Sequence, residues 1–355
     1  MAAAAVAAAT DWTDDSLPKD LLISDGLQAE FTYSSIPQNG QFTAPEEVKQ
    51  QCFVLNGRGR NYTVERNGFA LQSLDFARFA DVDVYDMHQC AEHLYPVVED
   101  VLRAAFPSCT KPIIFDHILR NPSLYSKEAA LAAEEEVSAK SDGNGEAGVF
   151  DGTGVHTKTP MLAAGPVTSV HGDYTVRSGF TRAADLLRPH ETQERIEAAL
   201  AQRFAFVNVW VPLRAVERDP LALIDWQSAK PQDVVNLTLV FKHRQGEIYK
   251  VLPSKDHRWV YFPDMQRDEC IVFKTFDSAT DEGRARHVLH SAFTDPTASP
   301  AAPPRESVEV RCVVFFGDLP SDFAASYVAP HLLPDSPDQE LKPLRTVVGD
   351  VSDEW

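Results

Sequence analysis

The short sequence His171-Gly172-Asp173 holds the pair of side chains whose types and spacing best suit chemistry. It follows residues 167–170, a stretch that favours a β-strand. In an extended segment residues i and i+2 point to the same side, so an imidazole and a carboxylate can reach one metal ion. Such a pair arises often by chance in a chain with 11 histidines and 52 acidic residues, so it needs a third ligand before it is informative.

A third ligand is available in His290, which opens a predicted strand at residues 290–293. His287 lies three residues earlier and competes for this role, and we favour His290 because it begins the strand. Two histidines and one carboxylate leave three coordination positions of a metal open, an arrangement that suits Fe(II) oxygenases. The predicted metal ligands are therefore His171, Asp173 and His290.

The stretch after the distal histidine supplies groups for binding a dicarboxylate. In a jelly roll the last strand returns from the floor of the barrel, which places Arg305 and Ser307 deep and Arg311 nearer the metal. A guanidinium fork beside a hydroxyl suits one end of a dicarboxylate, so we predict a 2-oxoglutarate site. Arg311 is an alternative for the same role. Asn208, an amide within an apolar stripe, is a further candidate, because a buried amide needs a partner that either the backbone or a ligand supplies.

Short β-like runs dominate the chain beyond residue 165. Turn-rich segments separate them, and one predicted helix over residues 192–202 interrupts them. The predicted strands cover residues 167–170, 204–211, 234–241, 247–252, 258–262, 270–275, 290–293 and 308–316. Five of them lie between Asp173 and His290, which is the number that brings both ligands to one mouth of a jelly roll. We predict a mainly β protein with flanking helices and a double-stranded β-helix (cupin-like jelly-roll) core.

The region before this core has a different character. Apolar residues recur at helical spacing over residues 82–106, which predicts one long amphipathic helix that ends before Pro107. Residues 127–160 are rich in Ala and Glu and then in Ser, Gly and Asn, which predicts a flexible surface insertion. We therefore divide one structural domain into a disordered leader (1–20), an N-terminal mixed region (21–160), the catalytic jelly roll (161–330) and a C-terminal extension (331–355).

Composition limits the classes of partner. The formal net charge of −19 disfavours binding to nucleic acid or to an anionic membrane, because the chain repels phosphate groups. Five widely spaced cysteines argue against a disulfide framework and favour a reducing compartment. No apolar stretch is long enough to span a bilayer. We expect a cytoplasmic protein with a small-molecule substrate, and the sequence carries no signal for an oligomeric state.

Several further blocks, in fixed order, give the chain a resemblance to a known family. They read HGD at 171–173, FVNVWVPL at 206–213, PLALID at 220–225, HRWVYFPDM at 257–265, FKTFDS at 273–278 and HSAFTDP at 290–296. Together they resemble the AsaB/CmcJ-type hydroxylase/desaturase family, which is similar to the gibberellin desaturases and cephem methoxylation proteins of microbial secondary metabolism. The resemblance implies a double-stranded β-helix that uses Fe(II) and 2-oxoglutarate. The insertion at 127–160 and the spacing of fifteen residues from His290 to Arg305 depart from the family pattern.

The expected activity is that of a non-haem Fe(II)/2-oxoglutarate-dependent dioxygenase that uses O2 to hydroxylate, desaturate or oxidatively cyclise a small metabolite, such as an amino acid or another carboxylate. Tyr174, Thr175, Trp210 and Arg258 are the candidate substrate-binding residues. Two alternatives stay open. A site of two histidines and one carboxylate also binds zinc in hydrolases, and a jelly roll with a vestigial site would be a catalytically inactive binding protein.

Overall fold

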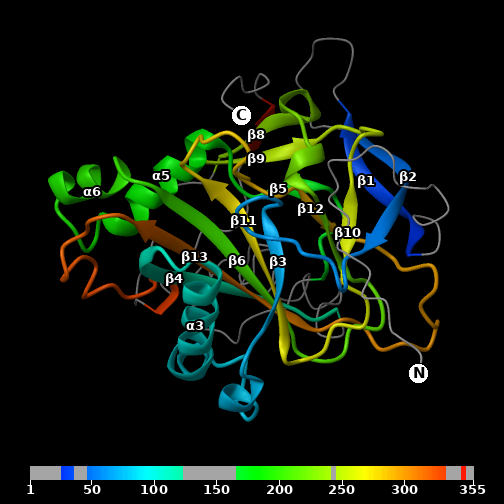
Figure 1. Cartoon of the computed structure of the whole chain (residues 1–355), viewed down its shortest axis with the longest axis horizontal. Helices are drawn as coiled ribbons and strands as arrows, with labels where there is room; N and C mark the ends of the chain where they lie inside the picture. Colours follow the sequence, from blue (N-terminus) through cyan, green and yellow to red (C-terminus); the bar gives the residue numbers. More distant parts are fainter. Residues whose placement is uncertain (1–24, 36–45, 123–164, 241–244, 333–344, 349–355) are drawn as a thin grey trace, which may run out of the picture.

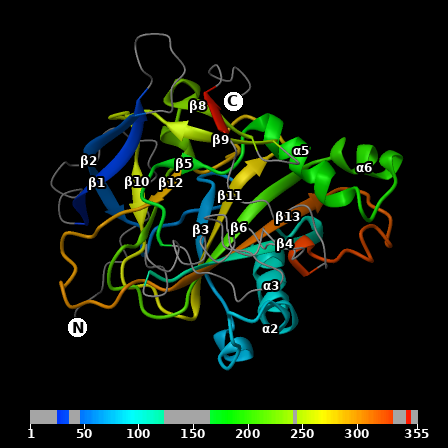
Figure 2. The same cartoon turned by 180° about the vertical axis from the view of Figure 1, so that it is seen from behind.

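Two stacked β-sheets form the centre of the computed structural model, which describes residues 25–35, 46–122, 165–240, 245–332 and 345–348. Figure 1 shows helices α5 (Val176–Leu187) and α6 (Gln193–Leu200) at one end of the molecule and the strand pair β1–β2 at the other. Helix α3 (Tyr95–Ala105) covers the outer face of the smaller sheet. The view from behind in Figure 2 shows the same three parts around the central strands.

The larger sheet has nine strands in the order β1-β2-β10-β7-β12-β5-β9-β8-β14. Their bounds are β1 Gly26–Ser35, β2 Glu46–Asn56, β5 His171–Gly172, β7 Leu221–Ile224, β8 Val234–Val240, β9 Gln245–Val251, β10 Trp259–Tyr261, β12 His290–Ala292 and β14 Arg345–Val348. All neighbouring strands are antiparallel except β2 and β10. The sheet curls until Thr32 of β1 bridges Ser169, two residues before β5.

The smaller sheet has five antiparallel strands in the order β3-β11-β6-β13-β4. Their bounds are β3 Phe69–Ser73, β4 Cys109–Arg120, β6 Phe204–Pro212, β11 Glu269–Asp277 and β13 Ser307–Phe316. Strand β6 lies at its centre and is buried along its whole length. A strand that is covered on both faces is expected to be almost continuously apolar, and Asn208 is the exception within β6.

Four apolar cores cover the faces of the two sheets, which explains why the strands carry apolar residues on these faces. Between the two sheets, Trp210, Leu223 and Phe273 pack together. On the outer face of the smaller sheet, Val209 and Val310 pack against α3. Two further cores lie under α5 and α6 and inside the curl of the larger sheet. Strands from before and after residue 161 share both sheets, so residues 25–122 complete the jelly roll.

The predicted β-rich jelly roll is confirmed, with local corrections. The helix predicted over residues 82–106 begins at Met87, where Asp86 caps it, and contains a short α2 (Met87–Gln89) and a π-helical turn η2 (Cys90–Leu94) before α3. The strand predicted at 167–170 is reduced to one bridge before β5. Four 3-10 turns complete the described elements: η1 Phe76–Phe79, η3 Trp226–Ser228, η4 Pro231–Asp233 and η5 Pro330–Leu332.

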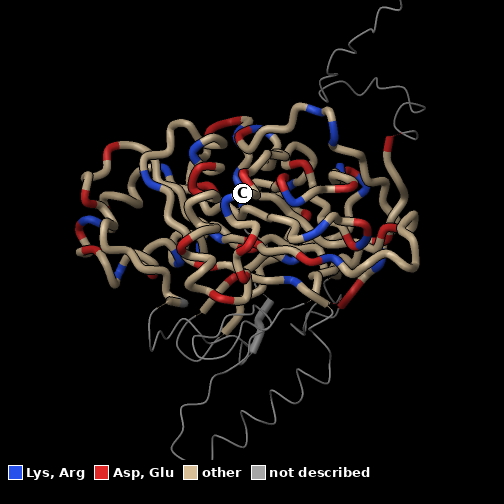
Figure 3. Tube along the Cα trace, turned by 90° about the horizontal axis from the view of Figure 1, so that it is seen from below, with Lys and Arg blue, Asp and Glu red and all other residues tan. Residues whose placement is uncertain are grey.

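The sequence patterns missed strands β1 to β4 and β14 and, within residues 161–330, one α-helix and one β-strand. Helix α5 follows the metal motif directly, and β7 is a sixth strand between Asp173 and His290, where we expected five. The predicted leader (1–20) and the insertion (127–160) lie outside the described residues, as does most of the extension at 331–355. No helix in the described ranges has the length and apolarity needed to cross a membrane. Figure 3 shows acidic and basic residues interspersed along the described chain.

Candidate metal centre

Strand pairing brings the three predicted ligands together. His171 opens β5 and His290 opens β12, and the two residues are direct partners in the antiparallel pairing of these strands. Asp173 follows β5, and its Oδ1 lies 3.5 Å from His171 Nε2 and 3.8 Å from His290 Nε2. One ligand atom from each residue lies within 4.8 Å of the others. The cluster therefore has the dimensions of a single metal site.

Backbone carbonyls orient both imidazole rings. His171 Nδ1 lies 2.8 Å from the Ser169 carbonyl oxygen, and His290 Nδ1 lies 3.1 Å from that of Val288. When Nδ1 carries the proton and donates it to the carbonyl, Nε2 has a free lone pair directed at the cluster. Gly172 permits this arrangement, because a Cβ there would lie 3.1 Å from the Leu289 side chain and 3.3 Å from that of Tyr249.

The electrostatics hold the ligands in metal-binding protonation states. Burial, and then the neighbouring His290, lowers the pKa of His171 to about 3, so its imidazole is neutral near pH 7. Burial alone would raise the pKa of Asp173, but His290 and His171, with a contribution from Arg311, lower it below its usual value. Metal binding requires a neutral imidazole and an ionised carboxylate. The residues therefore fit a divalent metal ion.

Asn208 supports a ligand instead of lining the cavity. Its Nδ2 donates to Asp173 Oδ2 at 2.9 Å, which leaves Oδ1 facing the two histidines. The side chain is buried in the middle of β6. Asp173 is thus a partner of the buried amide, and Asn208 is not among the residues that line the cavity, so contact of Asn208 with 2-oxoglutarate stays a prediction.

Three rows of side chains cross the smaller sheet beside the metal cluster, because strand register places residues of β4, β13 and β6 opposite one another. The rows are Asp116–Arg311–Asn208, Ile118–Glu309–Trp210 and Arg120–Ser307–Pro212. The first row lies at the metal end, since Asn208 contacts Asp173. Arg305 lies two residues before Ser307, the first residue of β13. It therefore comes after the third row, at the end of the three rows that is farther from the metal cluster.

The two candidate arginines for 2-oxoglutarate differ in their partners. Arg311 Nη2 forms an ion pair with Asp116 Oδ2 at 2.9 Å. Arg305 is 3% exposed, and its one hydrogen bond in the described part of the chain goes from Nη1 to the Asp219 carbonyl at 2.9 Å. Burial, and then Arg120, lowers the pKa of Arg305 to about 10. A buried cation without a carboxylate partner needs an anion, which favours Arg305 over Arg311 as the carboxylate-binding group.

A cavity of about 300 Å3 connects the metal cluster to Arg305. Trp210 and Tyr174 line it as expected, and the Arg305 guanidinium lies 5.3 Å from the centre of the Trp210 ring. Ser307 is completely buried in the third row and does not line the cavity, and its Oγ has no hydrogen-bond partner within the described residues.

Two predicted substrate-binding residues have other roles. Thr175 is the buried N-cap of α5, where its Oγ1 accepts from the Ser178 N–H and donates to Glu247. Arg258 Nη2 pairs with Asp225 Oδ2 at 3.1 Å and lines a different cavity beside β2 and β10. Neither residue is among those that line the metal cavity. Thr175 begins a helix that the sequence patterns did not predict, and Arg258 lies just before β10 beside the second cavity.

Sequence reasoning also missed residues that line the metal cavity. Arg120 ends the apolar run of β4, Glu309 lies in the middle row, and Arg182 on α5 approaches the Phe115 ring at 5.4 Å. A lone charged residue after an apolar strand was the available signal for Arg120. The position of α5 over the cavity depends on tertiary packing, so no local sequence motif could predict that Arg182 lines the cavity.

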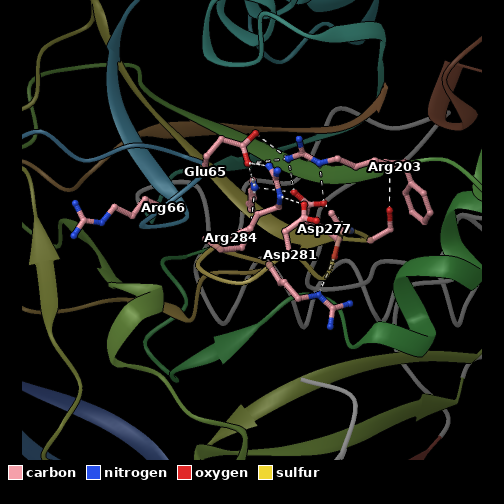
Figure 4. A network of polar contacts seen from close by, with 12 residues as sticks. Glu65, Arg66, Arg203, Asp277, Asp281 and Arg284 are labelled. Carbon is pink, nitrogen blue, oxygen red and sulfur yellow. Dashed lines mark hydrogen bonds and ion pairs between the residues drawn. The ribbon is translucent and has the colours of Figure 1, made fainter. Parts of the chain in front are cut away.

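A buried ion cluster holds the segment that leads to His290. Lys274 is fully buried and its Nζ contacts Asp277 Oδ2 at 2.7 Å, Glu65 Oε2 at 2.9 Å and the Ala285 carbonyl at 3.0 Å. Figure 4 shows the carboxylates of Glu65 and Asp277 with Arg203 and Arg284 beside them. The cluster ties β11 and the segment around Glu65 to the approach to β12.

The comparisons with known proteins agree with this geometry. A family model described as the oxidoreductase/YMDC permease-like domain matches residues 23–315. The chain belongs to this oxidoreductase family. It is similar to the hydroxylase/desaturase asaB of Aspergillus flavus, with 36% identity over 150 residues, which cover 39% of this chain and 66% of asaB. The expected kinship with the AsaB-type hydroxylase/desaturases is therefore confirmed.

Other proteins that are similar to this chain carry related names. The alpha-ketoglutarate-dependent dioxygenase phiK of a fungal species is 27% identical over 264 residues, which cover 73% of this chain and 81% of phiK. For the hydroxylase/desaturase CTB9 of Cercospora beticola the match is 36% identical and covers 43% of this chain and 48% of the relative. The chain thus spans less than two-thirds of the length of asaB and about half that of CTB9.

The fold is shared with a solved structure. The iron and alpha-ketoglutarate-dependent endoperoxidase NvfI superposes with a TM-score of 0.63 and 19% sequence identity, covering 83% of this chain and all of that chain. This likeness confirms the jelly-roll fold class.

Proposed function

We propose that this protein is a non-haem Fe(II)/2-oxoglutarate-dependent oxygenase that oxidises a small organic metabolite. The clustering of one ligand atom each from His171, Asp173 and His290 within 4.8 Å is the observation on which the proposal depends. Family membership supports it, because the named relatives are hydroxylase/desaturases and alpha-ketoglutarate-dependent dioxygenases.

The residues of the cavity have separable tasks in this proposal. The three ligands would hold Fe(II), which with O2 and 2-oxoglutarate supplies the oxidising chemistry, while the co-substrate is converted to succinate and CO2. Arg305 would bind the distal carboxylate of 2-oxoglutarate, and Trp210 would flank its carbon chain. The apolar walls, including Ile118 and Leu221, would exclude water from the reacting atoms.

The proposed substrate is a small metabolite that enters beside α5. Helix α5 contributes Ser178, Thr181, Arg182 and Asp185 to the cavity wall, so its polar face would contact the substrate. Hydroxylation, desaturation or oxidative cyclisation would follow from which substrate carbon faces the metal. We further propose a cytoplasmic location, consistent with five free cysteines in the described structure.

Anaerobic titration with Fe(II) and then 2-oxoglutarate tests the proposal. The expected result is a weak visible charge-transfer band in the wild type. The band should disappear in His290→Ala and should require much more 2-oxoglutarate in Arg305→Ala. Under O2, succinate should form in the wild type and not in His290→Ala.

Absence of the band in folded, metal-loaded wild-type protein would contradict the proposal. Zinc retained by the wild type and lost in His290→Ala would then favour a metal-dependent hydrolase, and no metal binding at all would favour a binding protein.

A further inference from the structure

A second cavity, with a volume of about 370 Å3, lies beside strands β2 and β10. The two strands pair only where residues 54–56 lie opposite residues 259–261. Just before β10 the backbone bonds to the segment after β7 instead: the Arg258 N–H donates to Ser228 Oγ, and the Arg258 carbonyl accepts from the Asp225 N–H, both at 2.9 Å. The cavity therefore lies where β2 and the segment before β10 separate.

This second cavity is separate from the metal cavity. Among the described residues, none lines both cavities. Strand β7 lies between them in the larger sheet, since Leu223 pairs with Val260 on one side and with His290 on the other. The sequence block at 257–265, on which part of the family resemblance depends, thus contributes to the second cavity and has no residue in the metal cavity.

The walls of the second cavity combine apolar side chains with a fixed polar support. The apolar lining consists of Phe53, Leu55, Tyr62, Trp259 and Val260. Trp259 Nε1 donates to the Tyr33 hydroxyl at 2.9 Å. His257 Nδ1 lies 3.0 Å from the same hydroxyl, and its Nε2 lies 3.2 Å from Asp233 Oδ2. Because these polar groups already have partners, they hold the wall in place, and an aromatic ring is a suitable body to pack against it.

Two cations line the same cavity and have capacity to bind an anion. Arg258 Nη2 donates to Asp225 Oδ2 at 3.1 Å, whereas Nη1 forms no hydrogen bond within the described ranges, and the side chain is 34% exposed. Asp225 therefore orients the guanidinium without using all of its donors. Lys255 is exposed, and in the described part of the chain its ammonium group forms no hydrogen bond or ion pair.

The acidic residues nearby have partners of their own. Asp225, the one acid in the described lining, accepts from Arg258 and from two neutral N–H donors at 3.2 Å. Asp256 lies next to Lys255 in sequence and forms an ion pair with Lys230. The described lining therefore holds two cations against one acid, an excess of positive charge that a single carboxylate would neutralise.

We propose that the second cavity binds a small aromatic carboxylate. The carboxylate would bind to Arg258 Nη1 and to Lys255, and the ring would pack against Tyr62 and Trp259. The inference does not depend on the proposed function, because it uses no residue of the metal cavity.

The test uses 2-naphthoate as the probe and 2-naphthamide as a neutral compound of the same shape. Anaerobic calorimetric titration of the whole chain, loaded with Mn(II), measures the Kd of each compound. We expect one-to-one binding of 2-naphthoate. The Kd of 2-naphthamide should be at least about 10-fold higher, since the amide cannot form the charge-assisted hydrogen bond to Arg258.

Matched variants locate the bound probe. Lys255→Met removes an exposed cation, so it should leave the fold intact and raise the 2-naphthoate Kd about 2- to 5-fold. Arg258→Met should raise this Kd about 10-fold in protein whose circular dichroism spectrum matches that of the wild type. Arg305→Met is the same substitution in the metal cavity, and it should change the Kd less than about 2-fold.

Four results would overturn the inference. The wild type might show no saturable binding of 2-naphthoate, or it might bind the acid and the amide equally well. The Kd of 2-naphthoate might be unchanged in both Lys255→Met and Arg258→Met, or it might rise only in Arg305→Met, which would place the probe in the metal cavity. None of these results would alter the outcome of the Fe(II) and 2-oxoglutarate titration, which tests the proposed function separately.

Discussion

At the scale of single residues, the metal ligands could be found from sequence because their signal is local. Two ligands lie two residues apart in an extended segment, and the third begins a strand. The role of Asn208 could not be found in this way, because its contact with Asp173 depends on the register of β6 against its neighbours. The ion pair of Arg258 with Asp225 could not be found for the same reason, since the two residues are far apart in sequence.

Asn208 should determine how well the site binds metal. Its amide holds Asp173 Oδ2 at 2.9 Å and so fixes which oxygen faces the histidines. We expect Asn208→Leu, which keeps the volume and removes the donor, to weaken Mn(II) or Fe(II) binding about 10- to 100-fold. Anaerobic calorimetric titration measures this directly. Asn236→Ala, on β8, is the control, and an Asn208→Leu affinity equal to that of the control would contradict the prediction.

At the scale of elements, the strands with strong apolar patterns were predicted to within a few residues, as for β6, β8 and β13. Strand β7 was missed because four apolar residues carry too little pattern, although they pair with both β10 and β12. Helix α5 was missed because Gly179 and a polar first turn weaken its helical pattern. Packing against Phe276 compensates, since a Cβ at position 179 would lie within 2.7 Å of that ring.

The ion cluster around Lys274 should stabilise the link between β11 and the approach to β12. Lys274→Met leaves Asp277 buried with one cation fewer, so we expect it to lower the free energy of unfolding by roughly 3 to 5 kcal/mol. Urea denaturation at pH 7 measures the change. Lys49→Met removes an exposed ion pair with Glu30 and should leave the unfolding midpoint unchanged. A loss for Lys274→Met no larger than that of this control would refute the argument.

At the scale of the whole molecule, the jelly-roll class could be predicted from the number and spacing of short strands. The sequence did not predict that strands from the N-terminal region complete both sheets. β1–β2 joins the larger sheet through the parallel pairing of β2 with β10, a contact between residues about 200 positions apart. No turn motif and no periodic pattern in the sequence predicts a pairing between strands so far apart. Completion of the two sheets therefore depends on contacts between residues far apart in sequence. The free energy of unfolding of the whole protein measures how strong these contacts are.

Histidines buried in these long-range contacts should make stability depend on pH. Burial, and then Arg286, lowers the pKa of His287 to about 3, and its ring packs between Trp226 and Tyr249. In the unfolded chain the imidazole takes up a proton near its ordinary pKa of about 6.5, whereas in the folded protein it stays neutral down to about pH 3. Stability is therefore retained above pH 6.5 and lost progressively as the pH falls toward 3.

For His287 alone this loss amounts to about 1.3 kcal/mol between pH 7 and pH 5.5. Urea unfolding of metal-free wild type and His287→Gln at both pH values measures it, and the fall in stability should be smaller by that amount in the variant. Glu65, whose pKa is lowered to about 2, affects only the range below its ordinary value of 4.5, so it does not contribute in this window. His171 contributes equally to both proteins and cancels in the difference. Parallel pH profiles for the two proteins would show that His287 is protonated as readily in the fold as in the unfolded chain.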